Sequence, residues 1–197
     1  RDSSVTGVQT CALPIYFGAE YDSLSDMVSF GVAPALVMYV WALKPMGKLG
    51  WIAAFIYCVS AALRLARFNT NSGSSDKRYF QGLPSPAAAA LLAGLVWVCF
   101  DNDLPGDLVF YPWLKMKWIA WTITLFAGIS MVSDLRFYSG KNINLKNSVP
   151  FVVILLIVLA FVLVSYSPPE VLFFVALVYG LSGYVMWLMQ RLKKKAV

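Results

Sequence analysis

The stretch Gly18-Ala-Glu-Tyr-Asp22-Ser-Leu-Ser-Asp26 runs into an apolar segment that carries no charge from Val28 to Leu43. Its glycine and two aspartates are four residues apart, so on a helix they lie along one face. Carboxylates at the mouth of a membrane span are costly unless they bind a cation, pair with one or face water. Acids also suit the first turn of a helix, where the dipole favours negative charge. The spacing alone leaves an ion site and a solvated first turn equally open.

The composition of the whole chain indicates an all-α membrane protein. Of the 197 residues, 59% are hydrophobic and 13% are charged, whereas a soluble domain carries about 25% charged residues. Apolar runs of near membrane-spanning length follow one another. The sequence therefore predicts a polytopic integral membrane helical bundle with six transmembrane helices, over Gly18–Leu43, Trp51–Phe68, Pro86–Phe100, Trp118–Asp134, Val149–Ser165 and Val171–Gln190.

The residue types limit the chemistry that is open to the chain. It has no histidine, which removes the usual general base and the commonest metal ligand, so catalysis would depend on carboxylates or lysine. Its three cysteines, Cys11, Cys58 and Cys99, show no paired or metal-binding spacing. The net charge of +6 is spread over several loops, which favours contact with anionic lipid headgroups over nucleic acid.

The basic residues gather on one set of span ends and loops, including a polar loop over Thr70–Pro84 and a basic loop over Arg136–Asn147. Such a bias marks the cytoplasmic side of a membrane protein. The acidic turn at Asp22 and Asp26 is then predicted to lie on that side too. The predicted cytoplasmic side carries eleven basic residues and the opposite side carries four. The eleven are Arg64, Arg67, Lys77, Arg78, Arg136, Lys141, Lys146, Arg191, Lys193, Lys194 and Lys195, and the four are Lys44, Lys48, Lys115 and Lys117.

The first 15 residues differ in character from the rest. Arg1–Ile15 contains no basic region followed by an apolar core, so it does not read as a signal peptide. We expect residues 1–15 to be a non-native leader of the kind produced by adapter read-through, and residues 16–197 to form a single transmembrane domain without its original N-terminal helices.

Three blocks in order resemble the CDP-alcohol phosphotransferase family, whose full signature reads D-x2-D-G-x2-A-R-x8-G-x3-D-x3-D. The stretch from Gly18 to Asp26 matches the second half of this signature. The blocks Arg64-Leu-Ala-Arg67-Phe-Asn69 and Tyr79-Phe-Gln-Gly82-Leu-Pro84-Ser-Pro86-Ala are similar to the bacterial integral-membrane branch that uses serine as acceptor. Ser130-Met-Val-Ser-Asp-Leu-Arg136-Phe-Tyr-Ser is a weaker fourth match.

The resemblance implies a catalytic core of six helices, commonly dimeric, in the bacterial inner membrane with the active site facing the cytoplasm. It implies two divalent cations, Mg or Mn, with Asp22 and Asp26 among their ligands and Asp26 as the general base on the acceptor hydroxyl. The reaction implied is transfer of a phosphatidyl group from CDP-diacylglycerol to L-serine with release of CMP. Gly18 matches the signature glycine, where a missing side chain lets a neighbouring helix or the nucleotide approach closely.

Arg64, Arg67 and Asn69 are the remaining candidate substrate-binding residues. The two arginines are three residues apart at the predicted cytoplasmic end of the second span, where their planar forks suit a phosphate or the serine carboxylate. Alternatively, they anchor the span by snorkelling to the membrane surface. Asn69 is equally suited to ending the helix or to touching substrate.

The match is incomplete, because D-x2-D-G-x2-A-R is not found upstream of Gly18. We therefore expect the polypeptide as printed to be inactive, and activity to return with an upstream segment that carries this half. Two alternatives stay open: another acceptor within the family, such as glycerol phosphate or inositol, and a small membrane transporter with its acids on an ion path.

Overall fold

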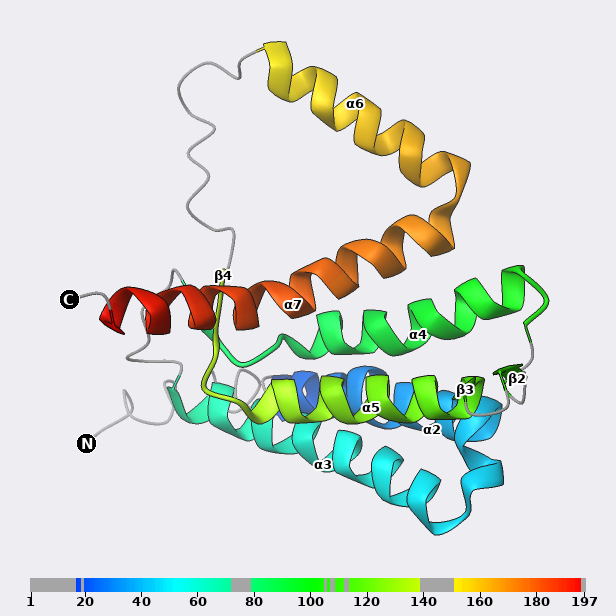
Figure 1. The fold of residues 1–197 in the computed structure, drawn as a ribbon. Helices are drawn as coiled ribbons and strands as arrows, with labels where there is room; N and C mark the ends of the chain where they lie inside the picture. Colours follow the sequence, from blue (N-terminus) through cyan, green and yellow to red (C-terminus); the bar gives the residue numbers. More distant parts are fainter. Residues whose placement is uncertain are drawn as a thin grey trace, which may run out of the picture.

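The structure is a computed structural model that describes residues 17–18, 20–71, 79–104, 106, 109–111, 114–138 and 151–195. These residues form six helices, which confirms the all-α prediction (Figure 1). The leader expected over residues 1–15 lies outside the described part. The helices are Glu20–Met46, α3 (Lys48–Asn71), α4 (Ser85–Asp101), α5 (Met116–Val132), α6 (Phe151–Tyr166) and α7 (Pro168–Lys195).

The first helix is wound unevenly along its length. Directly after Asp26 it passes through a π-helical segment, η1 (Met27–Val32), before the regular turn α2 (Ala33–Met38). A second π segment, η2 (Tyr39–Leu43), and a short 3-10 turn, η3 (Lys44–Met46), follow. π segments inside helices often occur at functional sites.

Tight approaches of small residues hold the helices together, as is typical of membrane bundles. A Cβ added at Gly128 of α5 would lie 3.2 Å from the Cα of Tyr57 in α3, and one at Gly94 of α4 would lie 3.2 Å from the Cβ of Phe173 in α7. The core between these helices is fully buried at Tyr57, Leu91 and Met131. The α3–α5 and α4–α7 pairs therefore form the main packing of the bundle.

The described residues also form two short antiparallel ladders, one of which lies within the segments predicted as loops over Thr70–Pro84 and Arg136–Asn147. Strand β1 (Tyr79–Gln81) pairs with β4 (Arg136–Tyr138), with Phe80 opposite Phe137. Strand β2 (Val109–Tyr111) pairs with β3 (Leu114–Lys115). The loop predictions were therefore wrong where β1 and β4 form, because strands of two or three residues leave no periodic pattern to recognise.

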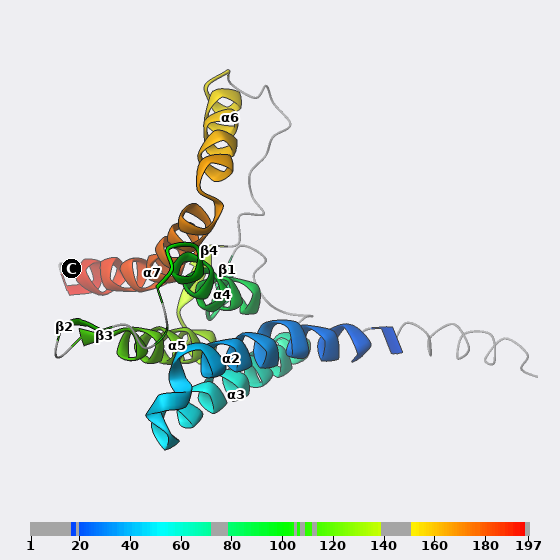
Figure 2. The same cartoon turned by 90° about the vertical axis from the view of Figure 1, so that its right-hand side faces the viewer.

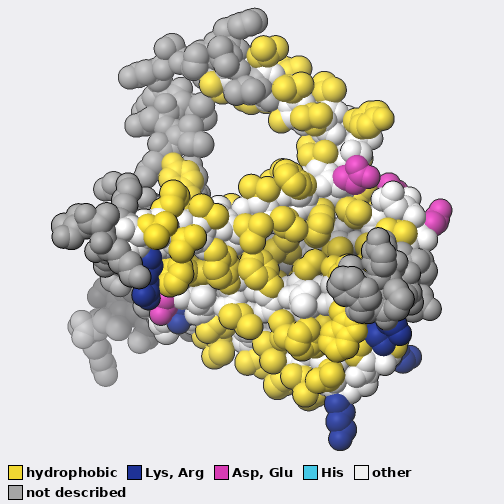
Figure 3. Space-filling view, viewed as in Figure 1, with side chains coloured by type: hydrophobic (Ala, Val, Ile, Leu, Met, Phe, Trp, Pro, Cys, Tyr) yellow, Lys and Arg dark blue, Asp and Glu magenta, His cyan; other side chains and the backbone are white. Residues whose placement is uncertain are grey.

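Several helices are as long and as apolar as membrane-spanning helices. Three of them are long and apolar enough to cross a bilayer, Glu20–Met46, Lys48–Thr70 and Pro168–Leu192, and Ser85–Asp101, Met116–Val132 and Val153–Tyr166 are shorter. Hydrophobic side chains cover the middle of the face drawn in Figure 3, and the charged side chains lie toward its two ends. The chain is an integral membrane protein, while the count of six spans stays a prediction.

Helix α6 stands apart from the other five (Figures 1 and 2). It packs chiefly on α7. Its apolar side chains are largely exposed, up to 75% at Phe161. An exposed apolar helix on a membrane bundle is suited to face lipid.

Candidate active site

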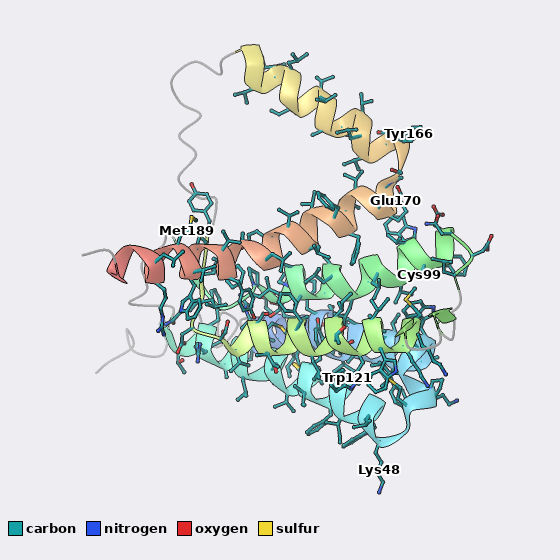
Figure 4. The ribbon with its side chains drawn as sticks, viewed as in Figure 1. Lys48, Cys99, Trp121, Tyr166, Glu170 and Met189 are labelled. Atoms are coloured by element: carbon teal, nitrogen blue, oxygen red, sulfur yellow. The ribbon has the colours of Figure 1, made fainter. Side chains whose placement is uncertain are left out.

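Five helix ends meet at one end of the bundle, which we call the site end (Figure 1). The start of the first helix and the start of α4 lie there, together with the ends of α3, α5 and α7. Figure 4 shows Met189 toward this end of α7, whereas Lys48 and Glu170 lie toward the other end of the molecule. The residues predicted from the sequence to form the site are therefore brought to the same end by the fold.

Asp22 and Asp26 lie one helical turn apart on the first helix, as the spacing predicted. Asp22 is exposed and Asp26 is half-buried, so the second carboxylate faces more of the protein. A side-chain hydrogen bond ties this turn to α3, since Asn69 Nδ2 donates to Ser23 Oγ at 3.0 Å. Asn69 therefore joins the acidic turn to the end of the neighbouring helix.

Arg64 of α3 lies within electrostatic range of Asp26 and of Tyr179 of α7. Among the described side chains, it forms neither an ion pair with the first nor a hydrogen bond with the second. Its Nη1 donates to Ser85 Oγ, at the first residue of α4, over 2.7 Å. Its Nε is buried and has no hydrogen-bond partner in the described part of the chain. A buried donor without a partner is costly, and a bound anion would satisfy it.

Arg67 has different partners although it lies only one turn further along α3. Its Nη1 is 2.9 Å from Asp134 Oδ1 and donates to the carbonyl of Val132 at 3.3 Å. Both side chains are accessible, at 36% for Arg67 and 79% for Asp134. Arg67 therefore joins α3 to the end of α5. A substrate anion would have to compete with Asp134 for the Arg67 guanidinium.

Gly18 is exposed and has helical backbone geometry, two residues before the described start of the first helix at Glu20. No described atom outside its own surroundings lies within 4 Å of a Cβ built there. Among the described residues no helix makes the close approach that the sequence allowed, and the role of this glycine stays a prediction.

Three residues of this region were missed from the sequence: Ser85, Asp134 and Tyr179. Ser85 and Asp134 lie inside blocks that carried the family resemblance, so their position could have marked them. Tyr179 lies in the apolar run of α7, about 115 positions after Arg64, and nothing local distinguishes it. Its position at the site depends on how α7 packs on α4.

The donor atoms suit a hard divalent cation, but they are too few for a complete site. Asp22 and Asp26 supply carboxylate oxygens, which Mg and Mn prefer. The described residues contain no group of three or more acidic, cysteine or histidine side chains able to hold a metal. A cation held by these two aspartates would therefore need further oxygen ligands from outside the described residues or from substrate.

Comparison with known proteins identifies the family to which the chain belongs. The family model described as CDP-alcohol phosphatidyltransferase matches residues 15–129, a range that includes both aspartates, both arginines and Ser85. The chain belongs to this family, which is a family of enzymes of lipid synthesis that generally use divalent metals. The matched range ends before β4 and α7.

The individual relatives share one name, CDP-diacylglycerol–serine O-phosphatidyltransferase. The protein of Helicobacter pylori strain 26695 is 32% identical over 180 residues, covering 90% of this chain and 70% of the relative. That of Mycobacterium tuberculosis strain H37Rv is 43% identical over 120 residues, covering 58% and 41%. That of Methanocaldococcus jannaschii is 37% identical over 126 residues, covering 64% and 52%.

Proposed function

We propose that this chain transfers the phosphatidyl group of CDP-diacylglycerol to the hydroxyl of L-serine, forming phosphatidylserine and releasing CMP. The observation that carries the proposal is the position of Arg64, which lies within electrostatic range of Asp26 and has a buried Nε donor with no hydrogen-bond partner among the described residues. Serine offers a hydroxyl to the carboxylate and a carboxylate to the arginine. Inositol has no anionic group for Arg64, and the names of the relatives favour serine over glycerol phosphate.

In the proposed reaction the serine oxygen attacks the lipid-bearing phosphorus of the diphosphate. A new oxygen–phosphorus bond forms, the bond from that phosphorus to the bridging oxygen breaks, and CMP leaves with the electron pair. Asp26 takes the hydroxyl proton, a task open to a carboxylate in a chain without histidine. Arg64 holds the serine carboxylate beside Asp26. Gly18, Arg67 and Asn69 are the other proposed substrate-binding residues.

Asp22 and Asp26 are the proposed protein ligands of the divalent cations, Mg or Mn, two of which we expect in the working enzyme. When bound, such cations neutralise the charge of the diphosphate and of the leaving phosphate. The chain's own contribution is to hold two carboxylates one turn apart at the start of a membrane helix. The choice of metal is tested by CMP release in Mg and Mn titrations.

We further propose that the site end faces the cytoplasm, in the bacterial inner membrane, and that the protein works as a homodimer. The orientation is supported by the excess of basic residues on the predicted cytoplasmic side, where there are eleven, over the opposite side, where there are four. Of the eleven, Arg64, Arg67 and Arg191 belong to helix ends at the site end. The dimer is a prediction from the family resemblance alone, and it is tested by light scattering of the detergent-solubilised protein.

The deciding experiment measures CMP release from CDP-diacylglycerol with L-serine, glycerol 3-phosphate and inositol as acceptors. The chain is assayed as printed and preceded by a segment that carries D-x2-D-G-x2-A-R. We expect Mn- or Mg-dependent release with serine in the second form only. Preference for another acceptor would overturn the serine assignment, and full activity of the first form would overturn the metal-ligand assignment.

The role of Asp26 is tested in the active form by Asp26→Asn, with Glu170→Gln as the matched control. Glu170 is an exposed acid in the first turn of α7, at the end of the bundle opposite the site end. Loss of a general base costs roughly 10²- to 10⁴-fold in rate. We expect such a loss for Asp26→Asn and an unchanged rate for Glu170→Gln, and an equal rate for both variants would contradict the proposal.

A further inference from the structure

Ser85, the first residue of α4, is a buried polar residue that contacts an arginine of another helix. Only 1% of its surface is exposed. Its Oγ accepts a hydrogen bond from Arg64 Nη1 of α3 over 2.7 Å. A hydrogen bond from a charged donor is stronger than one between neutral groups. Ser85 therefore holds one end of the Arg64 guanidinium firmly.

The bond to Ser85 restricts how the Arg64 guanidinium can turn. The guanidinium is planar and carries its five N–H donors in a rigid fork, so holding Nη1 limits rotation of the whole group. Its Nε donor is buried and has no hydrogen-bond partner among the described residues, although the side chain as a whole is only half-buried. The fork is thus held in one orientation with a donor left over for an anion.

The turn before α4, residues 82–84, sets the position of Ser85. Gly82 has a positive φ of 75°, and a Cβ there would overlap the Met131 carbonyl of α5, so only glycine suits this turn. The Gly82 N–H donates to the Leu135 carbonyl at 2.9 Å. The turn is therefore fixed on the chain at the end of α5.

A second set of contacts joins the same turn to α5 and α7. The side chain of Leu83 is fully buried, and its N–H donates to the Ser130 carbonyl at 2.9 Å. The Oγ of Ser130 is in turn hydrogen-bonded to the Tyr184 hydroxyl of α7 at 2.7 Å. The acceptor of the Arg64 hydrogen bond is therefore anchored to three helices, its own and these two.

We propose that Ser85 is a positioning residue whose hydroxyl holds the Arg64 guanidinium in the orientation that binds the acceptor's carboxylate. The proposal rests on the proposed function, because it takes Arg64 as the group that binds that carboxylate. Ser85 does not touch the reacting atoms. Loss of its hydroxyl should free the guanidinium to turn and so weaken the binding of L-serine. The chemical step and the binding of CDP-diacylglycerol should stay nearly unchanged.

The test compares Ser85→Ala and Ser85→Cys with Thr124→Val, all in the form that carries the upstream segment. Ser85→Cys keeps a side chain of similar size with only a weak acceptor, so the packing is retained. Thr124 is also fully buried, but its hydroxyl donates within its own helix, to the Ala120 carbonyl at 2.7 Å. For both Ser85 variants we expect the KM for serine to rise at least about threefold, with kcat and the KM for CDP-diacylglycerol within about twofold. For Thr124→Val we expect all three values to match the unaltered protein.

A double-mutant cycle tests whether Ser85 acts through Arg64. The ammonium of Arg64→Lys has no planar fork to orient, so Ser85→Ala added to it should lower kcat/KM for serine by less than about 1.5-fold. Independent effects would multiply instead. Thermal protection by L-serine, measured in detergent without turnover, should fall in both Ser85 variants and stay unchanged in Thr124→Val.

Three results would overturn the positioning role. They are an unchanged KM for serine in both Ser85 variants, an equal rise in Thr124→Val, and effects that multiply in the cycle. Absence of serine-dependent CMP release in the unaltered protein instead overturns the proposed function.

Discussion

Arg64 and Arg67 belong to one sequence block and lie three residues apart, but they have different partners in the structure. Arg64 lies within electrostatic range of the half-buried Asp26 and has a buried donor without a partner in the described part of the chain, whereas Arg67 is bonded to Asp134 and to the end of α5. The sequence could propose both as anion-binding groups, because their spacing and chemistry are the same. The roles of the two arginines can be distinguished only from the packing of the helices.

We expect Arg64→Lys to lower kcat/KM for serine at least about tenfold, because an ammonium lacks the planar fork that bonds Ser85 and an anion together. The matched change Arg67→Lys should lower kcat/KM by less than about threefold. It should cost at most about 1 kcal/mol of stability, since the ion pair with Asp134 is accessible to solvent. Steady-state kinetics and thermal unfolding in detergent measure both, and the reverse ranking would assign the acceptor's anion to Arg67.

The glycines provide a second prediction at the scale of single residues. Gly183→Ala should destabilise the protein by about 1–3 kcal/mol, because the new methyl group collides with the fully buried ring of Phe137. Gly18→Ala should leave the unfolding temperature unchanged, because no described neighbour lies within 4 Å of its Cβ. Equal unfolding temperatures for the two variants would show that Phe137 is not seated on α7 as described.

At the scale of elements, the π-helical segment after Asp26 decides how the acidic turn meets α3. Gly31 of this segment packs against the Ala61 methyl group, where an added Cβ would lie at 3.1 Å. The Phe30 carbonyl accepts a hydrogen bond from the buried Tyr57 hydroxyl at 2.9 Å. These contacts fix the first helix on α3 at Tyr57 and Ala61, about one turn beyond Asp26.

We expect Tyr57→Phe to lower the free energy of unfolding by about 1–3 kcal/mol, because the Phe30 carbonyl loses its partner inside the bundle. Since the segment follows Asp26 directly, kcat should fall as well. Tyr184→Phe is the control for the loss of one interhelical hydroxyl remote from this segment. Thermal unfolding measures the first effect and CMP release the second, and an unchanged unfolding temperature would contradict the role given to the bond.

The elements also show how far the sequence alone could reach. Apolar runs predicted the six helices to within a few residues at most ends, because each run is long and its boundaries are polar or marked by proline. The acidic turn and Arg64 were predicted because they lie in short local motifs that resemble the blocks of a known family. Strand β4 and Tyr179 could not be predicted, since their positions depend on contacts between segments more than 40 residues apart, Tyr79 with Tyr138 and Tyr179 with Tyr138.

At the scale of the whole molecule, the orientation in the membrane is the property with the widest consequences. Asn102, after α4, and Thr70, near the end of α3, are exposed at opposite ends of the bundle. On a cysteine-free background we expect Asn102→Cys to react with a membrane-impermeant maleimide in intact spheroplasts, and Thr70→Cys only after lysis. Phe161→Cys in the exposed middle of α6 should stay unreactive in both, because lipid surrounds it. The opposite pattern at Asn102 and Thr70 would place the site end outside.

The seat of Phe137 on Gly183 has a consequence for biosynthesis. Because the ring belongs to β4 and the glycine to the last helix, the contact between Phe137 and Gly183 cannot form until that helix has been synthesised. A nascent chain held before Gly183 would already contain both aspartates and both arginines, yet the ring of Phe137 would lack this contact with α7. We therefore expect the docking of β4 on α7 to be among the last contacts that form as the chain folds.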